Sequence, residues 1–222
     1  MKTRRDALSA ASAVFASFVA FFTGGGITFL FFQQGDTGRL GVLVSVLPYL
    51  AGWLCAVGVL KLSSRLLPDS SAEEEGLPTH FPVKEDVLAS VLALAVLLAA
   101  NFAAAFLSGE SVSGEVTLAA VLTGVFLKPY CEETLFRYGM LSLLIRCGKL
   151  SRAVSVTVSA LTFALIHPIE SMPFAAFAGA VLGILATRHS GKAGLRRGVS
   201  CTFAVHAAYN LILYLVLYLV SL

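Results

Sequence analysis

Charged residues are scarce in this sequence, and its apolar stretches show no alternation with polar residues. Only 13% of the 222 residues are charged, whereas 57% are hydrophobic, and the mean hydropathy is +0.85. The scarcity of charge excludes a soluble enzyme and a disordered chain. The missing alternation excludes a transmembrane β-barrel, whose strands need one polar and one apolar face. Any membrane spans must therefore be helices.

Paired cysteines and clustered basic residues are missing as well. The cysteines form no CxxC pair and three lie in apolar runs, so we expect reduced, mostly inert thiols and exclude a secreted disulfide scaffold. The net charge is +3, but Lys and Arg are divided among short loops without a stripe of interleaved aromatics. Nucleic acid is therefore not an expected partner. The four cysteines are Cys55, Cys131, Cys147 and Cys201.

Repeated apolar runs of 18 or more residues are present instead, long enough to cross roughly 30 Å of hydrocarbon as helices. They predict an all-α, polytopic transmembrane helix bundle that forms one integral membrane domain, 1–222. Three glycines at 24–26 could kink the first span or admit a close neighbour. A polar cytoplasmic loop is expected at 63–86. The seven predicted spans are about 7–32, 40–60, 87–107, 117–145, 153–167, 173–187 and 201–220.

Basic residues fall in alternate loops of this scheme. Lys and Arg occur before the first span and after the second, fourth and sixth, whereas the other loops are mainly acidic. Positively charged loops resist translocation, so we predict a cytoplasmic N-terminus and a C-terminus on the opposite side. In the sixth span Ala175, Gly179 and Gly183 recur every four residues, which predicts close internal helix packing.

The fourth predicted span contains four charged residues inside an otherwise apolar helix. A lone charge at the centre of a bilayer costs about 2.5–3.5 kcal/mol on insertion scales. Lys128 and Glu132 are four residues apart, as are Glu133 and Arg137, so two internal ion pairs would make the span tolerable. A functional site is the other interpretation, and this helix alone favours neither.

Polar residues on two further spans favour the functional interpretation. His167 ends the fifth span in the segment Phe163-Ala-Leu-Ile-His167, while His206 and Asn210 lie four residues apart in the seventh and face the same volume. A single buried histidine is more often a core residue than a ligand. Two histidines, an asparagine and the charged helix, spread over three of seven spans, indicate a shared site.

These motifs resemble those of a known family. Glu132-Glu133-Thr-Leu-Phe-Arg137, Phe163-xxx-His167 and His206-xxx-Asn210 match, in order, the EExxxR, FxxxH and HxxxN motifs of the CPBP family. This family of intramembrane proteases includes the CAAX prenyl endopeptidases and the bacterial Abi-type proteins. The resemblance covers a motif-bearing core at about 117–214. It departs at Tyr138, where family members commonly carry glycine and this chain has glycine one residue later, at Gly139.

The resemblance implies an intramembrane endopeptidase that hydrolyses a peptide bond of a membrane-associated protein or peptide. Glu132 would activate water and His167 would help to hold it, while His206 and Asn210 would stabilise the oxyanion. The breadth of the family also implies a multi-pass protein of the bacterial cytoplasmic membrane, with the lipid bilayer as its surroundings.

Glu133 and Arg137 would form a supporting pair that keeps Glu132 from being neutralised. Cys131 could be a nucleophile, but no local charge pattern typical of a thiolate site accompanies it.

A zinc mechanism would use the same side chains in another way. Glu132, His167 and His206 supply the two imidazoles and one carboxylate typical of catalytic zinc, with one position left for water. No HExxH motif is present, so these ligands would come from three helices, and a metal-free glutamate mechanism is equally open.

Two other function classes are compatible with the sequence. One is a proton- or ion-coupled membrane transporter, and the other is a catalytically silent membrane scaffold. The absence of a detectable inverted repeat disfavours the transporter, and the complete set of polar residues disfavours the scaffold.

Overall fold

The computed structural model describes residues 2–33, 41–66, 84–108, 117–188 and 192–221. Every regular element within these ranges is a helix, as the sequence predicted. The chain divides into two compact units. The first comprises Met1–Gly76 and Thr134–Ser155, and the second comprises Leu77–Glu133 and Val156–Leu222.

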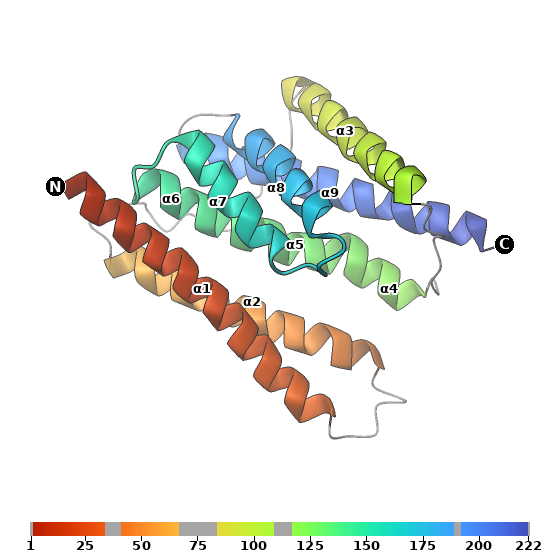
Figure 1. Cartoon of the computed structure of the whole chain (residues 1–222), viewed down its shortest axis with the longest axis horizontal. Helices are drawn as coiled ribbons and strands as arrows, with labels where there is room; N and C mark the ends of the chain where they lie inside the picture. The colour runs from red at the N-terminus through yellow and green to blue at the C-terminus, as the bar shows by residue number, and fades with distance from the viewer. Residues whose placement is uncertain (1, 34–40, 67–83, 109–116, 189–191, 222) are drawn as a thin grey trace. The chain divides into compact units, whose positions relative to one another are not determined.

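Four helices contain segments long and apolar enough to cross a membrane (Figure 1). They are α1 (Lys2–Gln33), α2 (Gly41–Leu66), α3 (Lys84–Ser108) and α9 (Lys192–Val220), and the segments are Arg5–Thr28, Val46–Ser63, Asp86–Phe106 and Gly198–Val220. These segments correspond to the first, second, third and seventh predicted spans.

The fifth and sixth predicted spans are shorter helices in the structure. The helix α7 (Arg152–Ala164) has 13 residues and α8 (Met172–Thr187) has 16. At 1.5 Å per residue they measure about 20 and 24 Å, less than a bilayer core of roughly 30 Å. The total of seven spans and the cytoplasmic N-terminus therefore stay predictions.

The fourth predicted span is one uninterrupted helix, 118–146, whose hydrogen-bond pattern changes four times along its length. It begins at Thr117, whose side chain accepts a hydrogen bond from the Ala120 N–H and caps the first turn. Two wider π-helical stretches flank the segment that contains Glu132, and such stretches are often found at functional sites. In order, the segments are α4 (Leu118–Leu122), η2 (Thr123–Leu127), α5 (Lys128–Glu132), η3 (Glu133–Leu141) and α6 (Ser142–Arg146).

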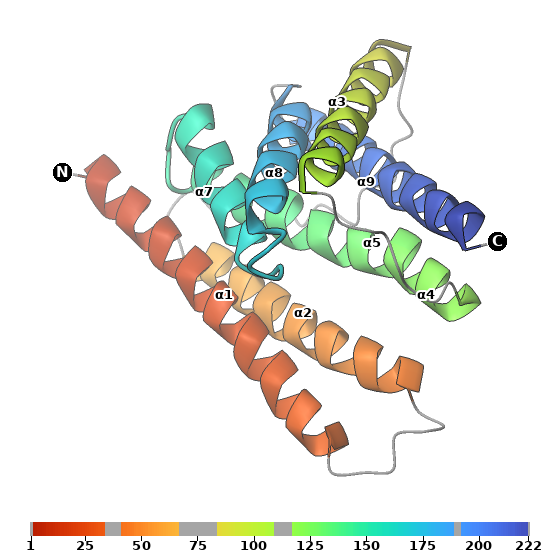
Figure 2. The same cartoon turned by 45° about the vertical axis from the view of Figure 1, so that its right-hand side comes forward.

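In the first unit, α1 and α2 form an antiparallel hairpin and lie side by side in both views (Figures 1 and 2). A Cβ atom added at Gly24 would lie 2.7 Å from Cys55 Sγ, and one at Gly25 would lie 3.0 Å from the Pro48 carbonyl oxygen. The helix α1 continues through these glycines, so they serve to admit a close neighbour, the second of the two predicted roles.

The hairpin also packs against the part of the long helix that lies in the first unit. The Trp53 indole N–H donates a hydrogen bond to Thr134 Oγ1 at 3.1 Å. A Cβ atom at Gly139 would lie 2.7 Å from Leu60 Cδ1. The glycine that follows Tyr138 is thus a point of close contact between η3 and α2.

In the second unit, α3, α8 and α9 pack around a shared apolar core (Figure 2). The predicted stripe of small residues on α8 faces α7: a Cβ atom at Gly179 would lie 3.0 Å from Ala160 Cα, and one at Gly183 would lie 3.0 Å from Val156 Cγ1. The expected internal packing of this stripe is confirmed. The buried core residues are Ala93, Leu97, Ala178, Leu182, Leu185, Cys201, Val205 and Tyr209.

Most of the predicted polar loop 63–86 lies outside the described residues, which resume at Lys84. The helix α2 extends to Leu66 and α3 begins at Lys84, so both described ends of this segment are helical. The charged loop residues at 36–39 and 110–115 also lie outside the described part of the chain.

Candidate active site

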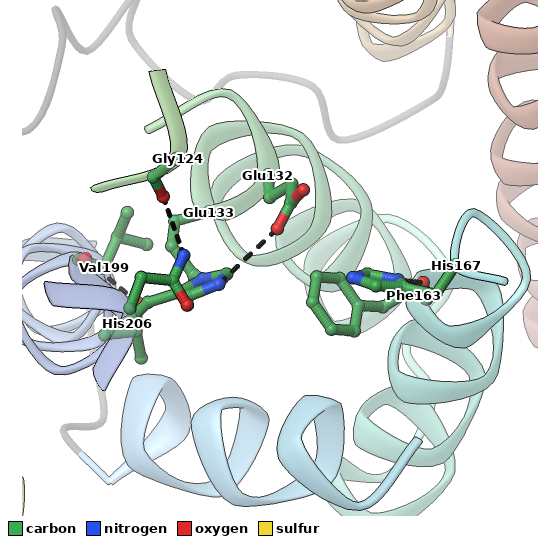
Figure 3. Close-up of polar contacts among 9 residues, drawn as sticks. Gly124, Glu132, Glu133, Phe163, His167, Val199 and His206 are labelled. Atoms are coloured by element: carbon green, nitrogen blue, oxygen red, sulfur yellow. Dashed lines mark hydrogen bonds and ion pairs between the residues drawn. The ribbon is translucent and has the colours of Figure 1, made fainter. Parts of the chain in front are cut away.

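His206, on α9, lies between the two adjacent glutamates of the long helix (Figure 3). Its Nδ1 atom is 2.9 Å from Glu133 Oε1, and its Nε2 atom is 3.6 Å from Glu132 Oε2. Glu133 is fully buried, Glu132 is 6% exposed and His206 is 9% exposed. Two motifs that are 73 residues apart in sequence thus meet in the interior of the second unit.

The contact with Glu133 places a hydrogen on Nδ1 of His206. An ionised carboxylate can only accept hydrogen bonds, so Nδ1 carries a hydrogen and donates it to Glu133. The other ring nitrogen, Nε2, is then presented towards Glu132. The two glutamates thus lie on opposite sides of the ring. Glu133 orients the imidazole, and Glu132 lies at its reactive side.

Asn210 lies one turn beyond His206 on α9 and binds the long helix at another point. Its Nδ2 atom donates a hydrogen bond of 2.7 Å to the carbonyl oxygen of Gly124, in η2. The contacts of His206 near residue 132 and of Asn210 near residue 124 show that α9 runs antiparallel to this helix. The polar side chains therefore lie along one seam between the two helices (Figure 3).

His167 lies beyond the end of α7, in the turn before Pro168. Its Nδ1 atom is 2.9 Å from the Phe163 carbonyl oxygen. Because a carbonyl only accepts, Nδ1 carries the hydrogen and Nε2 of a neutral ring is an acceptor. The Phe163 ring contacts both imidazoles, with centroids 4.6 Å from His167 and 6.1 Å from His206.

The other two charged residues of the fourth predicted span occupy different environments. Arg137 is fully buried in η3, within the first unit, and Lys128 is exposed on α5. A buried guanidinium needs polar partners because its desolvation is costly. The predicted support of Glu133 by Arg137 stays a prediction.

The predicted zinc ligands suit that metal in kind, since two imidazoles and a carboxylate are typical of catalytic zinc. The described residues do not gather them, however: no group of three His, Cys, Asp or Glu side chains within these ranges lies close enough to hold one metal ion. Glu132 and His206 lie together, whereas His167 binds the Phe163 carbonyl.

An apolar hollow of about 430 Å³ lies on the same seam of the second unit. It is formed by side chains of the long helix and of α9, namely Leu122, Phe126, Leu127, Tyr130 and Phe203. Tyr130 precedes Glu132 by two residues, and Phe203 precedes His206 by one turn. An apolar part of a bound molecule would therefore find a matching surface beside the polar site.

Sequence reasoning missed two features of this site. It did not find the Gly124 carbonyl, because a backbone acceptor has no signature in side-chain spacing. It also gave no role to Pro129, although a proline in the middle of a helical pattern is itself a signal that the hydrogen-bond ladder changes there.

The fold and the site together define a polytopic helical membrane protein in which carboxylates, an imidazole and an amide converge in the interior. Residues 114–212 match the family model described as type II CAAX prenyl endopeptidase Rce1-like. This match supports membership of the CPBP family and confirms the resemblance, since all three motifs lie inside the matched range. Neither the curated proteins nor the solved structures provide a match.

The match to a membrane protease family has three coarse implications. It supports a hydrolase as the class of enzyme, an integral membrane location, and a membrane-associated substrate. The apolar helices agree with that location.

Proposed function

We propose that this protein is an intramembrane endopeptidase that cleaves a membrane-associated protein or peptide with water as the nucleophile. The observation that carries the proposal is the convergence of Glu132, Glu133 and His206, all nearly excluded from solvent, at the seam between the long helix and α9. In a buried setting, charges and hydrogen-bond donors act strongly on a developing negative charge.

Glu132 acts as the general base. It takes a proton from a water molecule whose oxygen attacks the carbonyl carbon of the scissile peptide bond, and it then returns the proton to the leaving amine. His167 assists by accepting a hydrogen bond from that water through Nε2, because its Nδ1–H is held by the Phe163 carbonyl.

The tetrahedral intermediate places its negative charge on the former carbonyl oxygen. His206, as an imidazolium oriented and balanced by Glu133, donates to this oxygen through Nε2–H, and Asn210 donates through the amide hydrogen that does not bind Gly124. Removal of one such donor costs about 2.7–4 kcal/mol in other hydrolases.

The substrate is proposed to combine a cleavable peptide with an apolar anchor. The matching family is described as a CAAX prenyl endopeptidase, and the hollow beside the seam is lined by apolar and aromatic side chains. A peptide with a prenylated C-terminal CAAX sequence and the same peptide without the prenyl group are therefore the first substrates to compare.

The proposal is tested by peptide cleavage with purified protein in lipid vesicles. Glu132→Gln preserves size but removes the base, so we expect cleavage to fall by about 1,000-fold or more, in the range of lost catalytic groups in other hydrolases. Glu170→Gln is the matched control, because Glu170 is exposed between α7 and α8 and should leave the rate unchanged. Full cleavage by the Glu132→Gln variant would refute the mechanism.

Metal dependence is tested on the same preparation. The proposed steps use only side chains of this chain, so cleavage should persist after a chelator has removed bound metal. Loss of cleavage with chelator and its return with zinc would instead show a zinc-dependent reaction, for which Glu132, His167 and His206 are the predicted ligands. These are the residues whose chemistry suits that metal.

A further inference from the structure

The π-helical turn before the two glutamates has a local chemical cause. In an α-helix each carbonyl accepts a hydrogen bond from the N–H four residues ahead, and in a π-helix from the N–H five residues ahead. The Lys128 N–H bonds to the Thr123 carbonyl, five residues back. The next residue is Pro129, which has no N–H to donate.

The carbonyl of Gly124 therefore receives a hydrogen bond from neither of its two possible helical donors. The α-helical donor would be Lys128, whose N–H is directed to Thr123, and the π-helical donor would be Pro129. The side chain of Asn210 supplies the missing donor from α9, with Nδ2 at 2.7 Å from the Gly124 oxygen. Because Gly124 is buried, leaving this oxygen without a donor would be costly, and the contact is strongly favoured.

This contact fixes the orientation of the Asn210 carboxamide. A carbonyl oxygen only accepts hydrogen bonds, so the nitrogen of the amide, and not its oxygen, must face Gly124. One of the two amide hydrogens is used in the contact, and the other is held at a defined angle to it. A Cβ atom added at Gly124 would lie 2.5 Å from Tyr214 Oη, so a side chain there would require Tyr214 to move.

We infer that Pro129 is a positioning residue for peptide hydrolysis, because it frees the Gly124 carbonyl to orient the side chain of Asn210. The inference rests on the proposed function, in which Asn210 donates a hydrogen bond to the oxyanion. Pro129 itself does not touch the reacting atoms. It acts through the backbone of one helix on a side chain of another.

The first test reads the orientation of Asn210 without any cleavage assay. The chain has only two asparagines, Asn101 and Asn210, so selective ¹⁵N-asparagine labelling gives two side-chain amide signals in an NMR spectrum. An Asn101→Ala variant assigns them. In Pro129→Ala the restored N–H can bond the Gly124 carbonyl. We therefore expect the Asn210 signal to shift and its amide hydrogens to exchange at least about tenfold faster.

A matched control separates this effect from the general effect of removing a proline from a helix. Pro48 also lies inside a helix, in α2, which carries none of the proposed site residues. Pro48→Ala should leave the Asn210 signal and the cleavage rate unchanged. Alanine is a much better helix former than proline, so Pro129→Ala should fold with an equal or higher Tm.

The second test is kinetic and uses the peptide assay. Pro129→Ala should lower kcat by about 10- to 100-fold while KM changes by less than about twofold, because the substrate still binds but one oxyanion donor is misplaced. In the Asn210→Ala background the same substitution should change kcat by less than about twofold, since there is no amide left to orient. A merely structural role would lower Tm and raise KM instead.

Each contrary result has a distinct meaning. An unchanged Asn210 signal in Pro129→Ala overturns the inference whether or not the protein cleaves peptides. An altered signal with unchanged kcat overturns it too, as does an equal loss of kcat in the Asn210→Ala background. A wild-type protein that cleaves none of the test peptides refutes the proposed function, and with it the catalytic role of Pro129, even where the signal shifts.

Discussion

Two carboxylates meet the two nitrogens of the His206 ring, and their geometry gives them different roles. Glu133 is fully buried and bonds to Nδ1 at 2.9 Å, whereas Glu132 lies 3.6 Å from Nε2 and keeps slight access to solvent. In serine proteases a buried carboxylate on the rear nitrogen of the catalytic imidazole fixes its tautomer and stabilises the imidazolium. Glu133 occupies the corresponding position here, which leaves Glu132 to react with water.

Replacement of Glu133 by glutamine tests this assignment. The Gln side chain carries no negative charge and so no longer balances the His206 imidazolium that donates to the oxyanion, and we expect kcat to fall by about 100-fold or more. The kcat is measured with the peptide that the wild type cleaves, and size-exclusion chromatography checks that the variant is folded. A variant that retains more than about half of the wild-type kcat would contradict an orienting role for Glu133.

At the scale of single residues, the sequence predicted that the charged helix and His206 would share a site, but not how their side chains would bond. The spacing of His206 and Asn210 correctly placed both on the face of α9 that meets the long helix. Spacing along one helix carries no information about the partner helix. The contact of Glu133 with Nδ1, and that of Asn210 with a backbone carbonyl, therefore required the structure.

At the scale of helices, close packing in this protein depends on particular glycines. Gly179 of α8 faces the backbone of Ala160 in α7, with 3.0 Å available to a Cβ atom, whereas Gly58 of α2 has nothing within 4 Å. The helix α7 leads directly to Phe163 and His167, so its contact with α8 helps to determine where that histidine lies.

Alanine at these two glycines should have opposite effects on stability. Gly179→Ala should lower the free energy of unfolding by about 1–3 kcal/mol, because the added methyl group forces α7 and α8 apart. Gly58→Ala should raise it by about 0.5–1 kcal/mol, because alanine favours an exposed helix position. Reversible denaturation in detergent measures both variants. A Gly179→Ala variant as stable as the wild type would show that the close approach to α7 is not required.

Sequence patterns predicted the close contacts between helices better than they predicted the geometry of the helices themselves. The small residues of α8 pack as their spacing indicated, and the glycines of α1 admit a close neighbour, which was one of their two predicted roles. The π-helical segments were not predicted, because reasoning in steps of four residues assumes α-helical geometry throughout. Pro129 was the available signal, and it interrupts that geometry next to the glutamates.

At the scale of the whole molecule, the distribution of charge predicts how the chain crosses the membrane. Four segments in the described residues are long and apolar enough to span a bilayer, and α7 and α8 are shorter. Hydropathy identified the long segments because it depends on composition alone. The number of crossings depends also on how the short helices and the charged helix insert, which composition does not determine.

Reporter fusions test the predicted topology. Seven crossings with a cytoplasmic N-terminus place the two ends on opposite sides, because basic loops are retained in the cytoplasm. A fluorescent protein at the N-terminus should therefore be inside the cell, and alkaline phosphatase at the C-terminus should be active outside it. Both ends on one side would mean an even number of crossings and would overturn the predicted orientation scheme.

The central claim is that Glu132 and His206 work as one catalytic unit, and a double-mutant comparison tests it most directly. The kcat/KM for one peptide is measured for wild type, Glu132→Gln, His206→Ala and the double variant, in the same vesicles. Residues that act as a unit show strongly non-additive losses. The account predicts that the double variant is no slower than the slower single variant, within about threefold. Losses that multiply would contradict it, because they would mean that the two side chains act independently.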